Sequence, residues 1–486
     1  MSLLVTIPSG SFFLSQYLTD KIRSNDISDT EISYGIKQRV IEAVNYRFLK
    51  VDDQSIEWFY LAKILAKTDK EVAFKLAVIY YIEGDTPHAI YWYKQAAYLK
   101  HSKAKQALID LYISEHEFTL AKDLLLPLKA NKEALNQLLT LAVTLGDKKL
   151  ITDLVPLLEV QPHNKLLKQL KKYQITAVEH PVEKTLCANS IQFFATNLKH
   201  LNKLDKLIIS ISEHPLGQYF CFNTPRYIPL QQLDCRFDID KAIQCNDIVW
   251  SRFEPEISTR FIGLMLEKGG ANVDNGIMYL DEFDDIDVFI HELSHLVGFV
   301  DEYILSKNHK VCQNAQESMF SHNISILQPY YEGSRKEVLA ILAKQIPWFN
   351  LIDKQTPLLK RAGNKWKVGT PSHYLLKSNV EGNAELGLFE AETCQNNHVV
   401  AFKPTIDKTS LRYYEARFIE TYVDFLKTKP AHFLMPSYHY NIAKSLLKNN
   451  QEALAFQWLQ KALNNEVNDG DEYQRNRYNK VKLGKY

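Results

Sequence analysis

The sequence predicts a multidomain chain in which a region of α-helical repeats is followed by an α+β domain and then by a helical hairpin. Three observations favour this organisation. Like residues recur at a constant offset in the N-terminal third, short β-rich runs begin near residue 176, and a helical pattern returns after residue 430. With 486 residues, 46% of them hydrophobic and 24% charged, the chain is long enough for more than one hydrophobic core.

The N-terminal segment, residues 1–45, starts with short apolar pieces and small residues, but it lacks a basic start and is interrupted by Pro8 and Gly10. Two interpretations stay open for it: the remnant of a signal peptide, or an ordered part of the fold. No run of about 18 apolar residues occurs in the sequence, which predicts a chain without a transmembrane helix.

Residues 46–175 carry an internal repeat. Three pairs of like residues are each 32 positions apart: Leu76 and Leu108, Tyr80 and Tyr112, Ala89 and Ala121. Such an offset predicts stacked helix–turn–helix pairs, with a first turn at Gly84 and Asp85. The segment resembles Sel1-like and tetratricopeptide repeats, most recognisably in "AIYWYKQAA". Stacked pairs create a grooved surface, so the repeats are expected to bind a substrate or a protein partner.

Residues 176–430 form the predicted α+β domain. Short β-rich runs, "DKLIISIS", "TRFIGLMLE" and "NGIMYLDE", alternate with turn clusters such as "EKGGANVDNG". All six cysteines lie between residues 187 and 394. An even number confined to one domain favours up to three disulfides in a periplasmic or secreted protein, with six thiols in a cytoplasmic protein as the alternative.

Residues 431–486 return to a helical pattern in "NIAKSLLKNNQEALAFQWLQKAL". The alanine–tryptophan–alanine spacing of the repeat region recurs there at Ala455, Trp458 and Ala462. This predicts a C-terminal helical pair of the tetratricopeptide type.

The charge of the chain is close to balanced, with 58 Lys and Arg against 57 Asp and Glu. Proteins that bind nucleic acid normally carry a basic excess or a basic stripe that neutralises phosphates. Neither is present, so nucleic acid is not an expected partner.

The stretch "HELSHLVGFVDEY", residues 291–303, contains the candidate metal ligands. His291 and His295 are four residues apart, so on a helix they project from one face and can direct nitrogens at one ion. Acidic residues precede this helix, where its N-terminus favours negative charge. Gly298 allows the helix to end and the chain to turn, which lets Asp301 return as a third ligand.

Three protein ligands with an open fourth position are what a catalytic zinc site requires, so one zinc per chain is expected. Glu292, next to the first histidine, can reach a water on the ion without binding the ion itself. The pattern H-E-x-x-H-x-x-G-x-x-D resembles the metzincin clan of metallopeptidases, in which the last position is usually His and less often Asp. The resemblance implies an α+β zincin domain.

A second resemblance follows from "DEY" at 301–303 and from "LGLFEAETCQNNHVVAFKPTIDKTSLRYYE" downstream, with GLFE at 387–390. Both are similar to the family of IgA-specific metallopeptidases, over about residues 265–420. The resemblance implies a zinc-dependent endopeptidase of protein or peptide substrates, although not cleavage of immunoglobulin. The chain departs from the family in having Leu411 where a methionine is usual.

In the expected mechanism, Glu292 takes a proton from the attacking water and passes it to the leaving amine. Tyr303, Tyr413 and Tyr414 are candidate donors to the developing oxyanion. Glu302 is a candidate for orienting a ligand histidine.

The resemblance to metzincins also implies a methionine turn beneath the metal. Met319 is the candidate for that turn, and Leu411 is expected to occupy the space if Met319 does not.

Two alternatives remain. The chain could be a repeat-based binding or scaffold module whose peptidase-like domain keeps zinc only structurally or has lost it. A gluzincin-type site could instead take its third ligand from Glu381 or Glu385 in "NVEGNAELGLFE".

Overall fold

The computed structural model describes residues 10–160, 164–177, 187–236, 243–371, 386–395 and 397–465. The chain divides into two compact units, Met1–Leu141 and Ala142–Tyr486, and the division falls inside helix α9 (Lys132–Leu145). Helices are combined with small sheets, which confirms the mixed fold class at that level. Within the described ranges, no helix is both long enough and apolar enough to cross a membrane.

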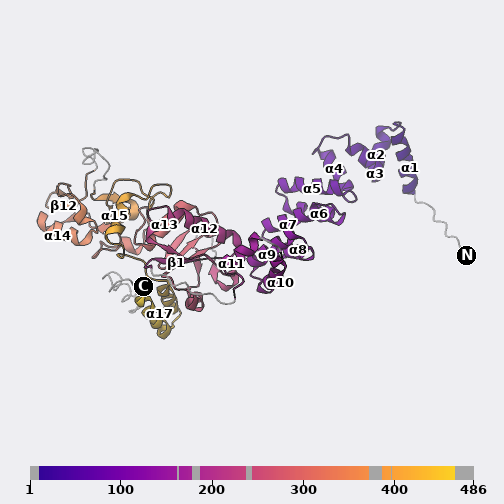
Figure 1. Cartoon of the computed structure of the whole chain (residues 1–486). Helices are drawn as coiled ribbons and strands as arrows, with labels where there is room; N and C mark the ends of the chain where they lie inside the picture. The colour runs from indigo at the N-terminus through magenta and orange to yellow at the C-terminus, as the bar shows by residue number, and fades with distance from the viewer. Residues whose placement is uncertain are drawn as a thin grey trace. The chain divides into compact units, whose positions relative to one another are not determined.

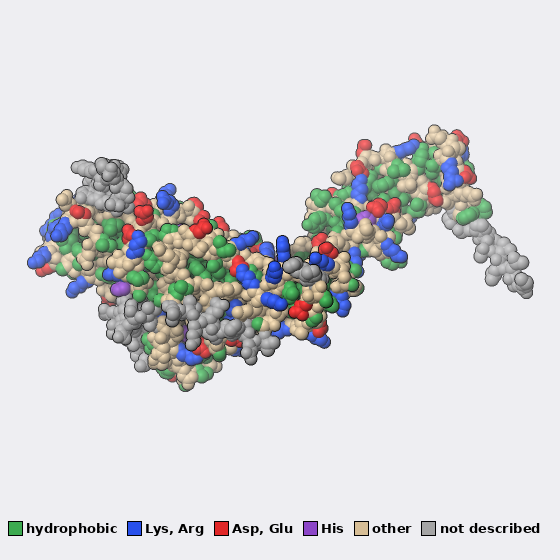
Figure 2. Space-filling view, in the orientation of Figure 1, with side chains coloured by type: hydrophobic (Ala, Val, Ile, Leu, Met, Phe, Trp, Pro, Cys, Tyr) green, Lys and Arg blue, Asp and Glu red, His purple; other side chains and the backbone are tan. Residues whose placement is uncertain are grey.

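The first unit consists of helices that pack in succession along the chain (Figure 1). Hydrophobic side chains are exposed among charged ones over these helices (Figure 2), including Tyr60, Tyr81, Tyr91 and Tyr98. The helices before α9 are α1 (Gly10–Arg23), α2 (Asp29–Lys37), α3 (Ile41–Phe48), α4 (Ile56–Leu65), α5 (Lys70–Ile82), α6 (Thr86–Tyr98), α7 (Ala104–Ser114) and α8 (Phe118–Leu125).

The helix–turn–helix pairs in this unit follow from their turn residues. Gly84 separates α5 from α6 at φ +77°, and Asp85 caps α6 by accepting a hydrogen bond from the N–H of His88. His116 lies 32 residues after Gly84 and takes the same left-handed conformation, at φ +60°. The predicted turn is confirmed, while the assignment to a named repeat family stays a prediction.

Most of the N-terminal segment is folded. Helices α1 to α3 pack around Leu18, Ile32, Val40 and Ala43. Residues 1–9, where a signal remnant would begin, lie outside the described residues.

The second unit is built on a sheet of strand order β2-β1-β6-β8-β7, with β3 also paired to β1. Strands β1, β6 and β8 are parallel, and β7 joins β8 antiparallel at one edge. Every residue of these three parallel strands is buried, as expected for a sheet covered on both faces. The strands are β1 (Ser190–Ala195), β2 (Cys221–Phe222), β3 (Arg226–Tyr227), β6 (Phe261–Met265), β7 (Asn272–Asp274) and β8 (Ile277–Leu280).

Helices α12 (Leu198–Ser212) and α13 (Ile286–Leu296) lie beside this sheet (Figure 1). Phe193 of β1 packs against Phe289 of α13, with ring centroids 5.5 Å apart. A Cβ on Gly263 of β6 would lie 2.1 Å from the Phe193 ring, so the glycine makes room for this contact.

Two of the predicted β-rich runs are strands, β6 and β8, but "DKLIISIS" is not. It forms the C-terminal half of α12, which Asn197 caps. Leu201, Leu204 and Ile211 are fully buried at helical spacing, so the apolar face of a longer helix overrides the local preference of isoleucine for strands.

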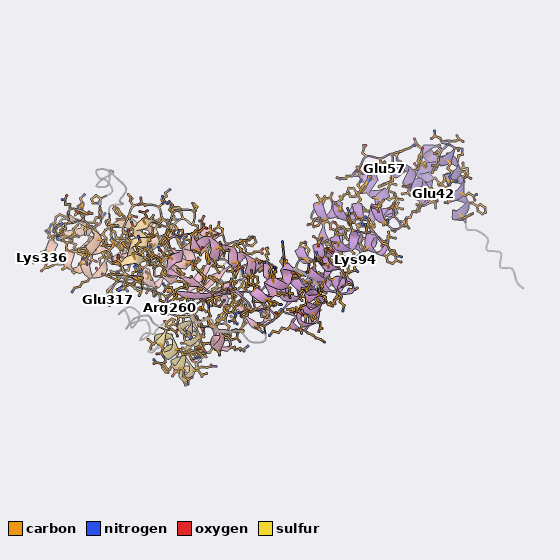
Figure 3. All side chains as sticks on the ribbon, viewed as in Figure 1. Glu42, Glu57, Lys94, Arg260, Glu317 and Lys336 are labelled. Atoms are coloured by element: carbon orange, nitrogen blue, oxygen red, sulfur yellow. A yellow bond between two sulfur atoms is a disulfide. The ribbon has the colours of Figure 1, made fainter. Side chains whose placement is uncertain are left out.

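The C-terminal helical pair, α16 (Tyr438–Lys448) and α17 (Glu452–Asn464), packs into the core of the second unit. Asn441 of α16 accepts a hydrogen bond from Gly276 N and donates one to Asp274 O, beside the edge strand. Arg260, labelled in Figure 3, donates to the carbonyls of Met435 and Asn465 and so secures both ends of the pair.

Smaller elements complete the second unit. Two three-stranded antiparallel sheets have the orders β13-β14-β9 and β10-β12-β11, and β4 pairs with β5. Their strands are β4 (Cys235–Arg236), β5 (Gln244–Cys245), β9 (Ser325–Leu327), β10 (Tyr330–Tyr331), β11 (Leu359–Ala362), β12 (Lys365–Val368), β13 (Phe389–Ala391) and β14 (Val400–Lys403). The remaining helices are α10 (Lys148–Glu159), α11 (Lys165–Lys172), α14 (Arg335–Gln345) and α15 (Glu420–Thr428).

All six cysteines pair, as Cys187–Cys221, Cys235–Cys245 and Cys312–Cys394. Three disulfides confined to the second unit match the expectation from the cysteine positions. They are typical of a chain that folds in an oxidising compartment.

Candidate metal centre

Helix α13 carries the histidine pair, and its sequence explains why it forms. Asp285 accepts hydrogen bonds from the N–H groups of Asp287 (3.0 Å) and Val288 (3.1 Å), which a helix N-terminus otherwise leaves without partners. Phe289 is fully buried and anchors the helix in the core. The predicted helix with an acidic start is therefore confirmed.

The helix ends at a turn that requires glycine. Gly298 has φ +92°, and a Cβ at this position would lie 2.7 Å from the backbone oxygen of Phe433. The turn brings the carbonyl of Phe299 back to His295, whose Nδ1 lies 3.0 Å from that oxygen. Gly298 thus ends the helix as predicted and also helps to orient a histidine.

Three candidate ligand atoms converge beyond this helix. Oδ1 of Asp301 lies 3.1 Å from Nε2 of His291 and 3.2 Å from Nε2 of His295. The ligand atoms around a tetrahedral zinc, at bond lengths near 2.0–2.2 Å, are separated by roughly 3.3 Å. The two separations from Asp301 to the histidines therefore come close to those between the ligands of a zinc ion.

Both imidazoles are oriented from behind by backbone carbonyls. Nδ1 of His291 lies 2.8 Å from the carbonyl oxygen of Ser410, and Nδ1 of His295 faces Phe299. A carbonyl only accepts hydrogen bonds, so each Nδ1 carries the hydrogen. In the neutral ring, this tautomer leaves the lone pair on Nε2, where a metal would bind.

The electrostatics of the centre follow from burial and from the close carboxylate. Burial alone would lower the pKa of His295, but the charge and hydrogen bond of Asp301 raise it to about 9. Burial opposes ionisation of Asp301, yet the two histidines hold the pKa of its carboxyl below the usual range. In the absence of a metal ion, the imidazole of His295 and the carboxylate of Asp301 therefore stabilise each other's charged form.

Glu292 is the residue whose surroundings are hardest to explain without a ligand. Its side chain is buried at 4% exposure, burial raises the pKa of its carboxyl, and Oε2 accepts no hydrogen bond from the described residues. His291, Glu292 and His295 form a group whose potential ligand atoms lie within 4.8 Å of one another, so this group could hold a metal ion. An unpaired buried carboxylate oxygen costs free energy that a water on the ion would recover.

Comparison with known proteins gives no family model and no curated protein that matches this chain. The interpretation of the centre therefore depends on its own geometry.

The three candidate tyrosines are not equivalent. The ring of Tyr414 meets that of His291 edge-on at 4.7 Å and is 44% exposed, so it faces both the centre and solvent. Tyr303 stacks near His291 at 6.2 Å, and burial followed by the charge of Asp301 raises the pKa of its phenol. The ring of Tyr413 instead contacts the cationic side chains of Lys408 and Arg412.

Glu302 is 1% exposed and is surrounded by donors from other segments, namely Asn323, Lys403, Thr409 and Tyr422. The Nδ1 atoms of both histidines are held by carbonyls, so the expected direct contact between Glu302 and a ligand histidine does not form. The side chain of Glu302 is hydrogen-bonded to these four residues and not to a ligand histidine.

Met319 is half-buried in an irregular segment before β9. The carbonyl of Ser410 contacts His291, and the next residue, Leu411, is fully buried. Leu411 directly follows the residue whose carbonyl faces His291, and the choice between Leu411 and Met319 for the position beneath the centre stays a prediction.

Glu381 and Glu385, the alternative third ligands, lie outside the described residues. The GLFE segment at 387–390 leads into β13, and the hydroxyl of Thr393 just beyond it donates to the carbonyl of Asp301 (2.9 Å). This segment therefore supports the backbone that presents Asp301.

Ser410 and Thr393 were not expected at the centre. Ser410 lies 119 residues from His291 and contributes only a carbonyl, which every residue type possesses. Thr393 also acts on a backbone oxygen. In the sequence, only the downstream run that begins at GLFE, residues 387–390, indicated that these regions belong to the site.

Proposed function

We propose that the second unit is a zinc-dependent endopeptidase that hydrolyses protein or peptide substrates. His291, His295 and Asp301 would hold the ion, and Glu292 would act as general base and then general acid. The observation that carries the proposal is the buried Oε2 of Glu292, which accepts no hydrogen bond from the part of the chain that the structure describes, beside three converging ligand atoms.

The donor set supports zinc as the ion. Two neutral imidazoles and one carboxylate leave a fourth position open, which is typical of catalytic rather than structural zinc. When bound, zinc would lower the pKa of a water and polarise the scissile carbonyl.

The residues of the chain then account for the proton transfers. Glu292 accepts a proton as the water oxygen bonds to the carbonyl carbon, and it delivers that proton to the amine nitrogen when the C–N bond breaks. Tyr414 supports the developing oxyanion, because among the three candidate tyrosines it is the exposed ring in edge-on contact with His291.

The proposal also covers the cellular compartment and the binding partners. The three disulfides favour a periplasmic or secreted enzyme, with the cytoplasm as the less favoured location. The helical pairs of the first unit, with their exposed tyrosines, would bind substrate segments or a protein partner.

The decisive experiment compares the wild type with Glu292→Gln. We expect about one zinc per chain in both proteins. The variant should cleave unfolded casein at least about 100-fold more slowly, because it lacks the general base. Glu332→Gln, which changes an exposed carboxylate paired with Lys365, is the matched control and should cleave as the wild type does.

The alternative is a repeat-based protein-binding or scaffold module whose zinc is structural or absent. The exposed tyrosines of the first unit are the observation in its favour. It would replace the endopeptidase if the wild type bound zinc without chelator-sensitive cleavage, or if Glu292→Gln cleaved at the wild-type rate.

A further inference from the structure

The two groups that complete the metal centre around α13 come from irregular segments. Asp301 lies in residues 299–309 and Ser410 in residues 404–419, and neither stretch contains a helix or strand. The positions of Asp301 and Ser410 are therefore not fixed by the backbone hydrogen bonds of a helix or a sheet, and other contacts must fix them.

A buried carboxylate joins these two segments. Glu302 Oε2 accepts hydrogen bonds from Lys403 Nζ (2.9 Å) and Thr409 Oγ1 (2.8 Å). Glu302 Oε1 accepts from Asn323 Nδ2 (3.1 Å) and from the hydroxyl of Tyr422. An ionised carboxylate offers about four acceptor sites, so these four donors use all of them.

The same residues tie the backbones together on either side. The N–H of Glu302 donates to the carbonyl of Leu411 (3.0 Å), directly after Ser410. The side-chain amide of Asn323 binds the backbone of Val300 twice: its Nδ2 donates to the Val300 carbonyl (2.8 Å) and its Oδ1 accepts from the Val300 N–H (2.9 Å). Lys403 also donates to the carbonyl of Asp407 (2.7 Å), at the start of the second segment.

We infer that Glu302 is a positioning residue of the metal centre. Its carboxylate fixes the segment that presents Asp301 against the segment whose Ser410 carbonyl orients His291. This inference rests on the proposed metal site. It adds the residue that keeps the segment carrying Asp301 and the segment carrying Ser410 in fixed positions relative to each other.

Glutamine cannot replace glutamate here, although it has the same shape. An amide has one oxygen and one NH₂ group. In either orientation the NH₂ would face one group that can only donate, the ammonium of Lys403 or Nδ2 of Asn323. The hydroxyl beside it, of Thr409 or Tyr422, would have to turn round to accept. The substitution therefore removes hydrogen bonds and places two donors against each other where the two segments meet, and it changes no metal ligand.

The test measures zinc affinity of the full chain by competition with a chromophoric chelator, together with amide hydrogen exchange. Glu302→Gln should weaken zinc binding about 10- to 100-fold, as loss of partners outside the ligand shell commonly does. Exchange should become faster in residues 299–309 and 404–415 and stay unchanged in β1 and β6. The combination Glu302→Gln with Lys403→Met should recover part of the affinity, because the amide no longer faces an ammonium group.

Glu256→Gln serves as the matched control. It breaks the pairing of Glu256 with the buried Arg226 in the same unit, and should leave zinc affinity at the wild-type value. If Glu302→Gln does not fold, Tyr422→Phe removes a single donor and provides the same two measurements.

The outcomes separate the two claims. A wild type that binds no zinc overturns the metal site and the positioning role together. A wild type that binds zinc, with unchanged affinity in folded Glu302→Gln, overturns the positioning role alone. Weaker zinc binding without faster exchange in the two segments also overturns it, because the effect then does not arise through their positions.

Discussion

The protonation of two imidazoles governs how the centre would take up a metal. Each Nδ1 is committed to a carbonyl, so only Nε2 can exchange a proton for an ion. In the metal-free chain, Asp301 raises the pKa of His295 to about 9, against the effect of burial. At neutral pH the ion must therefore displace a proton from His295.

Zinc affinity should rise about tenfold per pH unit from pH 7 towards pH 9 and then level off, since one proton leaves as one ion binds. The sign follows from the raised pKa, because His295 is protonated below that value and free above it. Titration calorimetry in buffers of different ionisation enthalpy measures the protons released. We expect close to one proton from His295 per zinc at pH 7.

Asp301→Asn provides the control for this prediction. Without the carboxylate, burial is the dominant influence and the pKa of His295 falls, so zinc binding should release fewer protons as well as being weaker. Equal proton release in this variant would contradict the coupling between the two residues.

The spacing in "HELSHLVGFVDEY" was sufficient to predict His291, His295 and Asp301 as neighbours, because helix periodicity and one glycine turn bring them together. The carbonyls of Ser410 and Phe299 could not be predicted in the same way. Their contribution depends on tertiary position and not on residue type.

At the level of elements, the end of α13 determines where the third ligand can go. Gly298 combines a left-handed backbone with a close approach to Phe433. The C-terminal segment adds to this junction, since Met435 N donates to the carbonyl of Leu296. The helix end is therefore held by a segment more than a hundred residues away in the sequence.

Gly298→Ala should lower the free energy of unfolding of the second unit by about 3 kcal/mol, from backbone strain and overpacking against Phe433. Zinc affinity should fall too, because the Phe299 carbonyl shifts. Gly270→Ala is the matched control: it also has positive φ, at +70°, but nothing lies within 4 Å of an added Cβ. It should cost only about 1–2 kcal/mol, as measured by urea unfolding of both variants.

Sequence patterns predicted some elements and not others for a physical reason. Strands β6 and β8 are short apolar runs bounded by turns, so a local window identifies them. In "DKLIISIS" the same window is misleading, since the helical face becomes visible only when Leu198 and Leu201 upstream are included. The antiparallel edge strand β7 lies in a run that turn residues dominate, and its pairing with β8 is a tertiary feature.

On the scale of the whole molecule, the disulfides and the candidate metal ligands all lie in one of the two units. All three disulfides and all the candidate ligands belong to Ala142–Tyr486, whereas the first unit, Met1–Leu141, is helical. Reagents that remove the metal or reduce the disulfides should therefore act on one unit only.

Calorimetry should show two unfolding transitions, of which chelation or reduction lowers only one. Zinc at 1,000 times its Kd stabilises the unit that binds it by about 4 kcal/mol. The Cys312–Cys394 bridge closes a loop of sequence separation 82, which corresponds to about 4.5 kcal/mol in the chain-entropy description. A shift of both transitions by the chelator would contradict the assignment of the metal to the second unit.

The bridge between Cys312 and Cys394 has a practical consequence for anyone who produces this protein. Thr393, the neighbour of Cys394, holds the backbone oxygen of Asp301. A chain expressed in a reducing cytoplasm would lack this disulfide. The Asp301 carboxylate would then be held less firmly in the position from which it could bind an ion. A zinc assay on material prepared that way should therefore be repeated after the disulfide has been formed.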